Sequence, residues 1–263
     1  MMFRKTILTH PNHFVFDNSY RFNSAQFSTE MVVGMKESTT RKRLLYIPGE
    51  SQSGKTTRIY HLFMDHDFRS EIFNALGTCA FIWCDCSSFT QDDDETVCCF
   101  ESKLVSRFAY LTKRADELSL SKQLDILKSD LGMTSPVVIL DSVRFNVKLL
   151  RRLNQLLQSM DIVFVVVMNY HDFRQVINVT DLNNNIQCPL PPCSEREMME
   201  LLAHLFKLSR KKYLTKDLVE LAKRTELSPG KAKELVQGRV SLLSDVEKLT
   251  YEPSKSALNI VDE

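Results

Sequence analysis

The segment that most constrains the fold is a glycine loop, Gly49-Glu50-Ser51-Gln52-Ser53-Gly54-Lys55-Thr56. It matches GxxxxGK[ST] at every fixed position and lies between an apolar run, Leu44 to Pro48, and a helical pattern, Lys55 to Met64. In such a loop the glycines allow a tight backbone path, the amide N–H groups point at phosphate, and the following helix adds the positive end of its dipole. The sequence therefore predicts a strand, a phosphate-binding loop and a helix, in that order.

The loop also assigns roles to single residues. Lys55 is expected to reach the β- and γ-phosphates of a nucleotide, and Thr56 to offer its hydroxyl to Mg²⁺. ATP and Mg²⁺ are thus the expected cofactors. We assign the nucleotide contacts to Gly49, Glu50, Ser51, Gln52, Ser53, Gly54, Lys55, Thr56 and Thr57.

A second candidate ligand follows a later apolar run. Val137 to Leu140 is an uninterrupted apolar stretch, and Asp141 comes directly after it. Nucleotide sites of this kind hold Mg²⁺ with an acidic residue at the end of another buried strand. We therefore predict Asp141 as a metal ligand that acts together with Thr56.

Short apolar runs alternate with helical patterns through the middle of the chain. Besides Leu44 to Pro48 and Val137 to Leu140, they are Ala80 to Cys84 and Ile162 to Met168. This alternation is typical of parallel strands covered by helices on both faces. We expect a three-layer α/β domain over residues 41–192, preceded by a mostly irregular lead-in, 1–40, with at most one short helix.

Helical periodicity replaces the strands after Pro189-Leu190-Pro191-Pro192. Ser194 and Glu197 have the spacing of a capping box, in which hydroxyl and carboxylate satisfy first-turn amides. We expect helices over 194–205, 216–223 and 231–243, which form a small helical lid over 193–250. The polar end of the chain, 251–263, is expected to be a loose tail.

Composition excludes several classes of protein. The chain is 43% hydrophobic and 25% charged, which favours an ordered globular fold. Its longest apolar run, Ile162 to Met168, is far shorter than the roughly 20 residues of a membrane-crossing helix, so no transmembrane segment is expected. A net charge of +1 excludes a wholly basic nucleic-acid-binding domain. Contact with duplex DNA would be local, at Arg41 to Arg43 or at Lys207 to Lys212.

The seven cysteines do not follow the pattern of a secreted disulfide scaffold, which favours a reducing, intracellular compartment. Cys84 and Cys86 with Cys98 and Cys99 lack the paired spacing of a structural zinc site, so buried thiols are the preferred interpretation. The acidic run from Asp92 to Glu95 lacks the spaced ligands of a calcium loop and is expected to be a solvated surface loop.

The loop at 49–56, the strand before Asp141, the strand ending in Asn169 and the helical lid together resemble the AAA+ ATPases. Within them the chain is most similar to initiator ATPases, in particular the family of the fifth subunit of the eukaryotic origin recognition complex. The matching stretches are LLYIPGESQSGKTT, AFIWCDCSSFT, VVILDSVRF, LLRRLNQLL and IVFVVVMNYHDF. The resemblance implies a nuclear subunit that binds ATP and assembles with other AAA+ subunits or with itself on DNA.

The resemblance also assigns roles to residues. Asn169 stands where these ATPases place a sensor of the γ-phosphate, although asparagine is also a common residue at the end of a strand. Ser142 stands where hydrolytic AAA+ proteins carry a glutamate that activates water, and a positioned base is worth about 10²- to 10⁴-fold in rate. We therefore expect ATP to be bound and hydrolysed slowly or not at all, and to stabilise an interface.

The chain also departs from the initiator pattern. Too few residues follow the lid for a winged-helix domain, and no arginine-finger motif precedes it, which leaves Arg174 as a substitute. Lys231 and Lys233 are the candidates for the sensor of the lid, with an ordinary solvated helix face as the alternative. Two other kinds of protein stay open: a STAND-type signalling switch, which CPLPPCSEREMMELL resembles, and a transposition-regulator ATPase of similar length.

Overall fold

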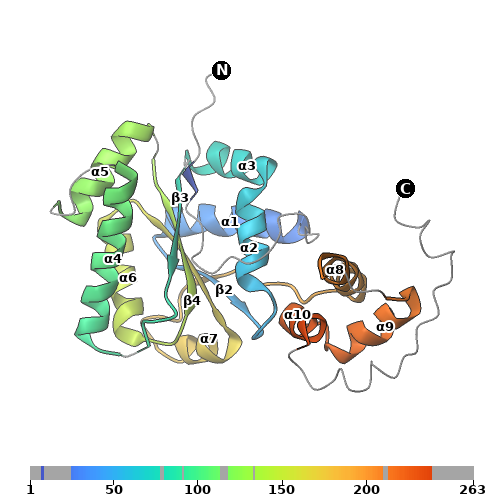
Figure 1. The fold of residues 1–263 in the computed structure, drawn as a ribbon. Helices are drawn as coiled ribbons and strands as arrows, with labels where there is room; N and C mark the ends of the chain where they lie inside the picture. The colour runs from blue at the N-terminus through green and yellow to red at the C-terminus, as the bar shows by residue number, and fades with distance from the viewer. Residues whose placement is uncertain are drawn as a thin grey trace. The chain divides into compact units, whose positions relative to one another are not determined.

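The computed structural model describes residues 7–8, 25–77, 80–90, 92–112, 118–132, 134–209 and 213–238. The chain forms two compact units (Figure 1). The first comprises Met1–Ser51 and Lys55–Pro191, and the second comprises Gln52–Gly54 and Pro192–Glu263. The tail expected over 251–263 lies outside the described residues, as does the end of the last helix expected in the lid.

A six-stranded parallel sheet forms the centre of the first unit within the described residues. The strand order is β1-β3-β4-β5-β2-β6. Strands β3, β4 and β5 are neighbours both in sequence and in the sheet, whereas β2 lies between β5 and β6. The strands are β1 (Ile7–Leu8), β2 (Leu45–Gly49), β3 (Ala80–Asp85), β4 (Val137–Val143), β5 (Val163–Asn169) and β6 (Ile186–Gln187). The four longer strands coincide with the four apolar runs of the sequence, which confirms the predicted α/β class.

Helices cover both faces of this sheet (Figure 1). They are α1 (Ala25–Arg41), α2 (Lys55–Met64), α3 (His66–Leu76), α4 (Asp94–Thr112), α5 (Leu120–Leu131), α6 (Val147–Ser159) and α7 (Tyr170–Ile177). Side chains of α1, α2 and α3 share one buried apolar cluster with one set of alternate strand residues. Side chains of α4, α5, α6 and α7 share a second cluster with the other set. Because strand side chains alternate between the two faces, β2, β3, β4 and β5 each contribute to both clusters.

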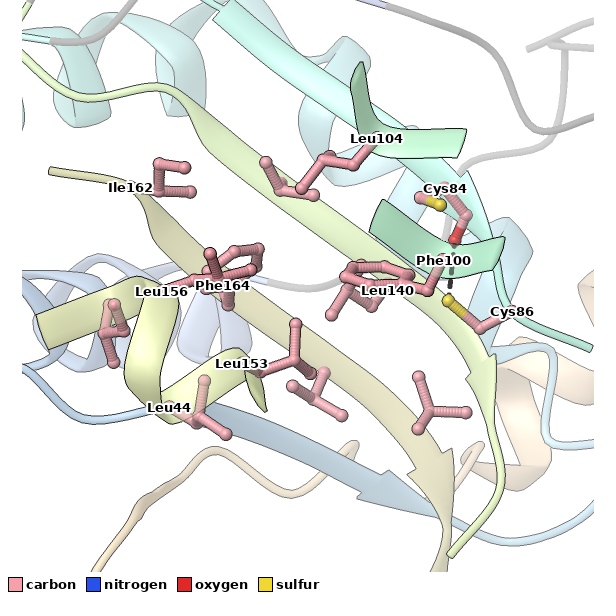
Figure 2. Close-up of a cluster of buried hydrophobic side chains, with 14 of the residues drawn as sticks. Leu44, Cys84, Cys86, Phe100, Leu104, Leu140, Leu153, Leu156, Ile162 and Phe164 are labelled. Carbon is pink, nitrogen blue, oxygen red and sulfur yellow. Dashed lines mark hydrogen bonds between the residues drawn. The ribbon is translucent and has the colours of Figure 1, made fainter. Parts of the chain in front are cut away.

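The second apolar cluster includes Cys84 and Cys86 (Figure 2). Both thiols are buried, and the Cys86 Sγ lies 3.6 Å from the Cys84 carbonyl oxygen. They pack as small apolar side chains beside residues such as Phe100 and Leu140, as the sequence predicted. The prediction of buried thiols is wrong for Cys98 and Cys99, which lie on α4 and are exposed. No group of three or more potential ligands in the described part of the chain could hold a metal ion.

Helix α1 is a difference from the sequence-based expectation. One short helix at most was expected in the first 40 residues, whereas α1 has 17 residues. Its side chains Phe27, Met31 and Met35 are buried against the sheet. These residues recur every four positions, which places them on one helix face. The turn-forming residues Pro11-Asn12 and Asp17-Asn18-Ser19 favoured an irregular segment over this spacing.

The acidic run after β3 also has a more specific role than a solvated loop. The Asp92 carboxylate accepts a hydrogen bond from the Lys148 backbone N–H at 2.8 Å, at the start of α6. Asp93 accepts one from the Thr96 N–H at 2.7 Å, in the first turn of α4. These carboxylates satisfy amides that a helix leaves without an internal partner.

The second unit contains three helices among its described residues, α8 (Glu195–Leu208), α9 (Thr215–Arg224) and α10 (Pro229–Gln237). The predicted capping box is present: Ser194 Oγ accepts from the Glu197 N–H at 3.2 Å, and Glu197 Oε2 accepts from the Ser194 N–H at 2.9 Å. Helix α10 ends earlier than expected, because Gly238 adopts a left-handed conformation that stops it. Within this unit the Gly230 N–H donates to the Gln52 carbonyl oxygen at 2.9 Å.

None of the described helices combines the length and the apolar character that crossing a membrane would require.

Candidate functional site

Four strands of the first unit end at the same edge of the sheet, which we call the carboxyl edge. Their last or nearly last residues are Gly49, Asp85, Asp141 and Asn169. Gly49 is paired with Asn169 across β2 and β5, and Asp85 is paired with Asp141 across β3 and β4. Parallel pairing thus brings together residues that are far apart in the sequence.

These four residues also belong to one face of the sheet. The residues two positions earlier on each strand, Ile47, Trp83, Ile139 and Val167, all lie in the cluster that contains side chains of α2. Since side chains on a strand repeat with a period of two, the terminal residues continue the same face. This is the face of the sheet against which α2, the helix that begins at the end of the glycine loop, packs.

The loop before α2 has the backbone conformation that its glycines predict. Gln52 and Gly54 have φ values of 58° and 74°, in the left-handed region. A Cβ atom at Gly49 would lie 3.0 Å from Lys55 Cδ and 3.3 Å from Leu190 Cβ. Glycine at 49 therefore lets the lysine side chain run close to the backbone, and glycine at 54 permits the turn into the helix.

The hydroxyl of Ser53 is a polar group of the loop that can donate a hydrogen bond to an anion. Its oxygen is buried and makes no hydrogen bond to any described residue. A buried hydroxyl without a partner costs free energy, and a phosphate oxygen would accept a hydrogen bond from it. Of the other predicted contacts, Glu50 and Ser51 are exposed and Thr57 is half-buried in the first turn of α2.

Lys55 links the loop to β5. Its ammonium donates to the carbonyl oxygens of Glu50 at 2.6 Å and Gly49 at 3.2 Å, and to Asn169 Oδ1 at 2.8 Å. Burial lowers the pKa of Lys55, while the negative charges of Asp141, Glu50 and Asp172 act in the opposite direction. A cation that is partly removed from water and held only by neutral oxygens is a good partner for a phosphate.

Thr56 links α2 to β4. Its hydroxyl donates to Asp141 Oδ2 at 2.8 Å. Burial raises the pKa of Asp141, the hydrogen bonds from Thr56 and from the Ser142 N–H lower it, and the charge of Asp85 raises it further. A hydroxyl next to a carboxylate is the hard oxygen set that Mg²⁺ prefers, so these two residues fit the predicted metal.

Asn169 does not use its side chain to cap α7, which begins directly after it. The side chain accepts from Lys55 instead. The structure thus links Lys55 to Asn169 and the adjacent Thr56 to Asp141, so the four predicted residues lie together at the carboxyl edge.

Ser142 interrupts the regular end of β4. Its φ of 59° is left-handed, and the pairing of β4 with β5 shifts register between Leu140 and Val143. A non-glycine residue in this conformation is uncommon and costs about 1–3 kcal/mol. The exposed Ser142 hydroxyl cannot replace a carboxylate as a base.

The sequence analysis assigned no role to Asp85. The signal for it was the same as for Asp141, because Asp85 follows the apolar run Ala80 to Cys84 directly. It was missed because no spacing rule connects it to the glycine loop. Only the pairing of β3 with β4 shows that the two aspartates are neighbours.

Arg58 was likewise not predicted. It lies on α2, is only 2% exposed, and its Nη1 donates to the Pro191 carbonyl oxygen at 2.6 Å. It thus connects the helix after the loop with the end of the first unit. Arg174, the substitute for an arginine finger, is exposed on α7. In the second unit, the sensor candidate Lys231 forms an ion pair with Glu226 at 2.6 Å.

No protein-family model and no curated protein sequence matches the chain. Solved structures are similar to it in fold. The Walker-type ATPase of Pyrococcus abyssi is 14% identical with a TM-score of 0.53, and the match covers 87% of this chain and 75% of that one. The ORC2 protein of Aeropyrum pernix, solved as ADPNP and ADP complexes, is 15% identical with a TM-score of 0.52, covering 89% and 66%.

Drosophila ORC bound to DNA contains a chain that is 12% identical with a TM-score of 0.51. The match covers 90% of this chain and 59% of that chain, so the present chain spans less than two thirds of this relative and of the Aeropyrum protein. At these identities the likeness concerns the fold alone: the chain shares its fold with the Walker-type ATPase and with the two ORC structures.

Proposed function

We propose that the chain is an ATP-binding, AAA+-like subunit of an intracellular assembly of the origin-recognition type, in which Mg-ATP stabilises an interface and is hydrolysed slowly. The observation that carries the proposal is the pair of links between loop and sheet, Lys55 to Asn169 and Thr56 to Asp141. Each link joins a residue of the glycine loop motif to a strand end. Together they position the Lys55 ammonium, the Thr56 hydroxyl and the Asp141 carboxylate, which are the groups that a magnesium nucleotide needs.

Different residues of the site bind different parts of the magnesium nucleotide. The Ser53 hydroxyl and the Lys55 ammonium bind phosphate oxygens, and Thr56 and Asp141 hold Mg²⁺. The metal, when bound, neutralises charge on the phosphates. Asn169 can respond to the γ-phosphate because a phosphate that takes the Lys55 ammonium releases the Asn169 amide from its present hydrogen bond.

The assembly role rests on the fold and on the sequence resemblance. Two of the similar structures are origin-recognition proteins, and one of these is bound to DNA. We propose the same setting here: other AAA+ subunits as partners, nuclear location, and duplex DNA contact through local basic groups. A STAND-type switch or a transposition regulator would share the site but differ in its partners.

A nucleotide titration tests the site. Lys55→Ala should weaken binding of a fluorescent ATP analogue about 10- to 100-fold, the value of one or two charge-assisted hydrogen bonds. Thr56→Ala and Asp141→Asn should remove the Mg²⁺ dependence of binding. Lys36→Ala, which removes an exposed lysine on α1, is the matched control. Equal affinity of Lys55→Ala and the wild type would refute the proposal.

Co-purification with and without ATP tests the assembly. The tagged wild type should recover AAA+ initiator subunits, and Lys55→Ala should lose them. Binding to duplex DNA should weaken as salt rises, because phosphate contacts release counterions. Recovery of adaptor or receptor proteins, or self-association without DNA, would favour the signalling switch instead.

A further inference from the structure

The carboxyl edge contains an acid that the proposed function leaves unused. Residue 142 has no carboxylate, and its left-handed backbone interrupts the strand at the point where a base would follow Asp141. Asp85 ends the neighbouring strand in register with Asp141. A carboxylate is thus present at this edge, on β3 and not after Asp141 on β4.

The orientation of Asp85 follows from the sheet. Phe81 and Trp83 on β3, and Val137 and Ile139 on β4, all point into the cluster shared with α2. Asp85 continues the first series, and Asp141 continues the second. Asp141 reaches Thr56 in the first turn of α2. Asp85 therefore faces the same side of the sheet as the metal and phosphate ligands.

The surroundings of Asp85 hold it at this position. It is half-buried, and its Oδ1 accepts a hydrogen bond from the Ser87 N–H at 2.9 Å. The Lys103 ammonium, from α4, donates to the Asp85 backbone carbonyl. The Cys86 N–H donates to the Asp141 carbonyl oxygen at 2.8 Å, which continues the pairing beyond the two aspartates. A side chain placed in this way is oriented before substrate arrives.

Two other acids near Lys55 are less suited to act as a base. Asp172 uses its Oδ1 to accept from the Phe145 N–H at 3.0 Å, which fixes it to the segment after β4. Glu50 lies on the loop itself, exposed to solvent. Neither residue ends a strand that is paired with β4.

We propose that Asp85 is the catalytic base for slow ATP hydrolysis, in place of the carboxylate absent at position 142. This inference rests on the proposed ATP-binding function. The Asp85 carboxylate takes a proton from a water molecule as the water oxygen bonds to the γ-phosphorus. The bond between that phosphorus and the bridging oxygen breaks, ADP leaves with the electron pair, and Asp85 returns the proton to solvent.

The test compares phosphate release with nucleotide affinity in the full chain. Asp85→Asn keeps the size of the side chain and the oxygen that accepts from Ser87, but it cannot take a proton. It should lower the rate of phosphate release from radiolabelled ATP about 100-fold or more, with ATP affinity and thermal midpoint unchanged. Asp85→Glu restores the carboxylate and should recover part of the rate.

Two control variants separate the base from general effects of charge and position. Ser142→Ala alters the residue that follows Asp141, and Asp172→Asn removes a negative charge near Lys55. Both should hydrolyse ATP at close to the wild-type rate. A loss of rate in either one that equals the loss in Asp85→Asn would overturn the assignment.

The remaining outcomes are also decisive. If the wild type binds ATP but releases no phosphate above the rate in buffer, Asp85 is not a base and the proposed binding function stands. If Asp85→Asn loses ATP affinity or unfolds, and Asp85→Glu does not recover the rate, the residue has a structural role and the inference is wrong. If the wild type does not bind ATP, both proposals fail.

Discussion

The glycine loop and the carboxyl edge of the sheet both contribute residues to the proposed nucleotide site, but they are formed in different ways. The loop, residues 49–56, is continuous in sequence, and its conformation depends on local properties such as the left-handed φ of Gly54. The edge is built from Asp85, Asp141 and Asn169, which end three different strands. Its geometry depends on the register of the sheet, so a local motif identifies the loop but cannot identify the edge.

Two hydrogen bonds join the regions, from Lys55 to Asn169 and from Thr56 to Asp141. Each begins in the loop motif and ends on the edge. A substitution that acts only on the loop should leave the sheet folded. A substitution in the core of the sheet should displace the residues of the carboxyl edge. The following experiments test this distinction, in order of decreasing effect.

Phe164→Ala should have the largest effect, because it leaves a cavity in the sheet that positions the edge. Phe164 lies on β5, is fully buried, and packs in the cluster with Leu156 (Figure 2). Loss of a buried phenylalanine costs about 3–5 kcal/mol of unfolding free energy. Urea denaturation measures it, with Tyr110→Ala, at a residue that is 78% exposed, as control. A loss below about 1 kcal/mol would contradict the central role of β5.

Gly54→Val and Gly54→Asn should separate backbone strain from the effect of adding a side chain. Both add a Cβ that would lie 3.3 Å from Pro229 Cβ, but asparagine tolerates the left-handed φ of 74° and a β-branched residue does not. We expect the valine variant to be less stable than the asparagine variant by about 1–3 kcal/mol. Thermal unfolding of the pair measures the difference. Equal stability would mean that the loop does not require this conformation.

Asp141→Asn should have the smallest effect on stability, and it should stabilise the protein where the preceding substitutions destabilise it. Burial raises the pKa of Asp141 above its value in the unfolded chain, about 3.9. The wild type therefore loses stability as the pH rises above that value and the buried carboxyl ionises, whereas the amide does not ionise. Without nucleotide, the variant should be more stable near neutral pH by on the order of 1 kcal/mol.

Unfolding curves from pH 4 upward test this sign. The advantage of Asp141→Asn over the wild type should grow with pH, and the same variant should lose the Mg²⁺ dependence of nucleotide binding. Asp125→Asn, which changes an exposed acid on α5, should show no such trend. A variant that is less stable than the wild type at neutral pH would show that Asp141 stabilises the sheet edge.

The sequence predicted the elements of the fold well where local signals were strong. The four apolar runs became β2, β3, β4 and β5, and α2 begins and ends at the predicted residues. The capping box at Ser194 is present. The two-residue strands β1 and β6 were not predicted, because so short a segment has no periodicity to read. Helix α1 was underestimated for a different reason, since its buried face becomes decisive only when the sheet is there to cover it.

The sequence by itself determined the glycine loop, because GxxxxGK[ST] fixes φ, charge and hydroxyl within eight consecutive residues. It also indicated Asp141 as the end of an apolar run. Only the tertiary structure decided that Asp85 pairs with Asp141, that Asn169 accepts from Lys55, and that Ser142 leaves the regular strand. The physical reason is that strand register depends on the packing of both faces of the whole sheet, so no short segment contains it.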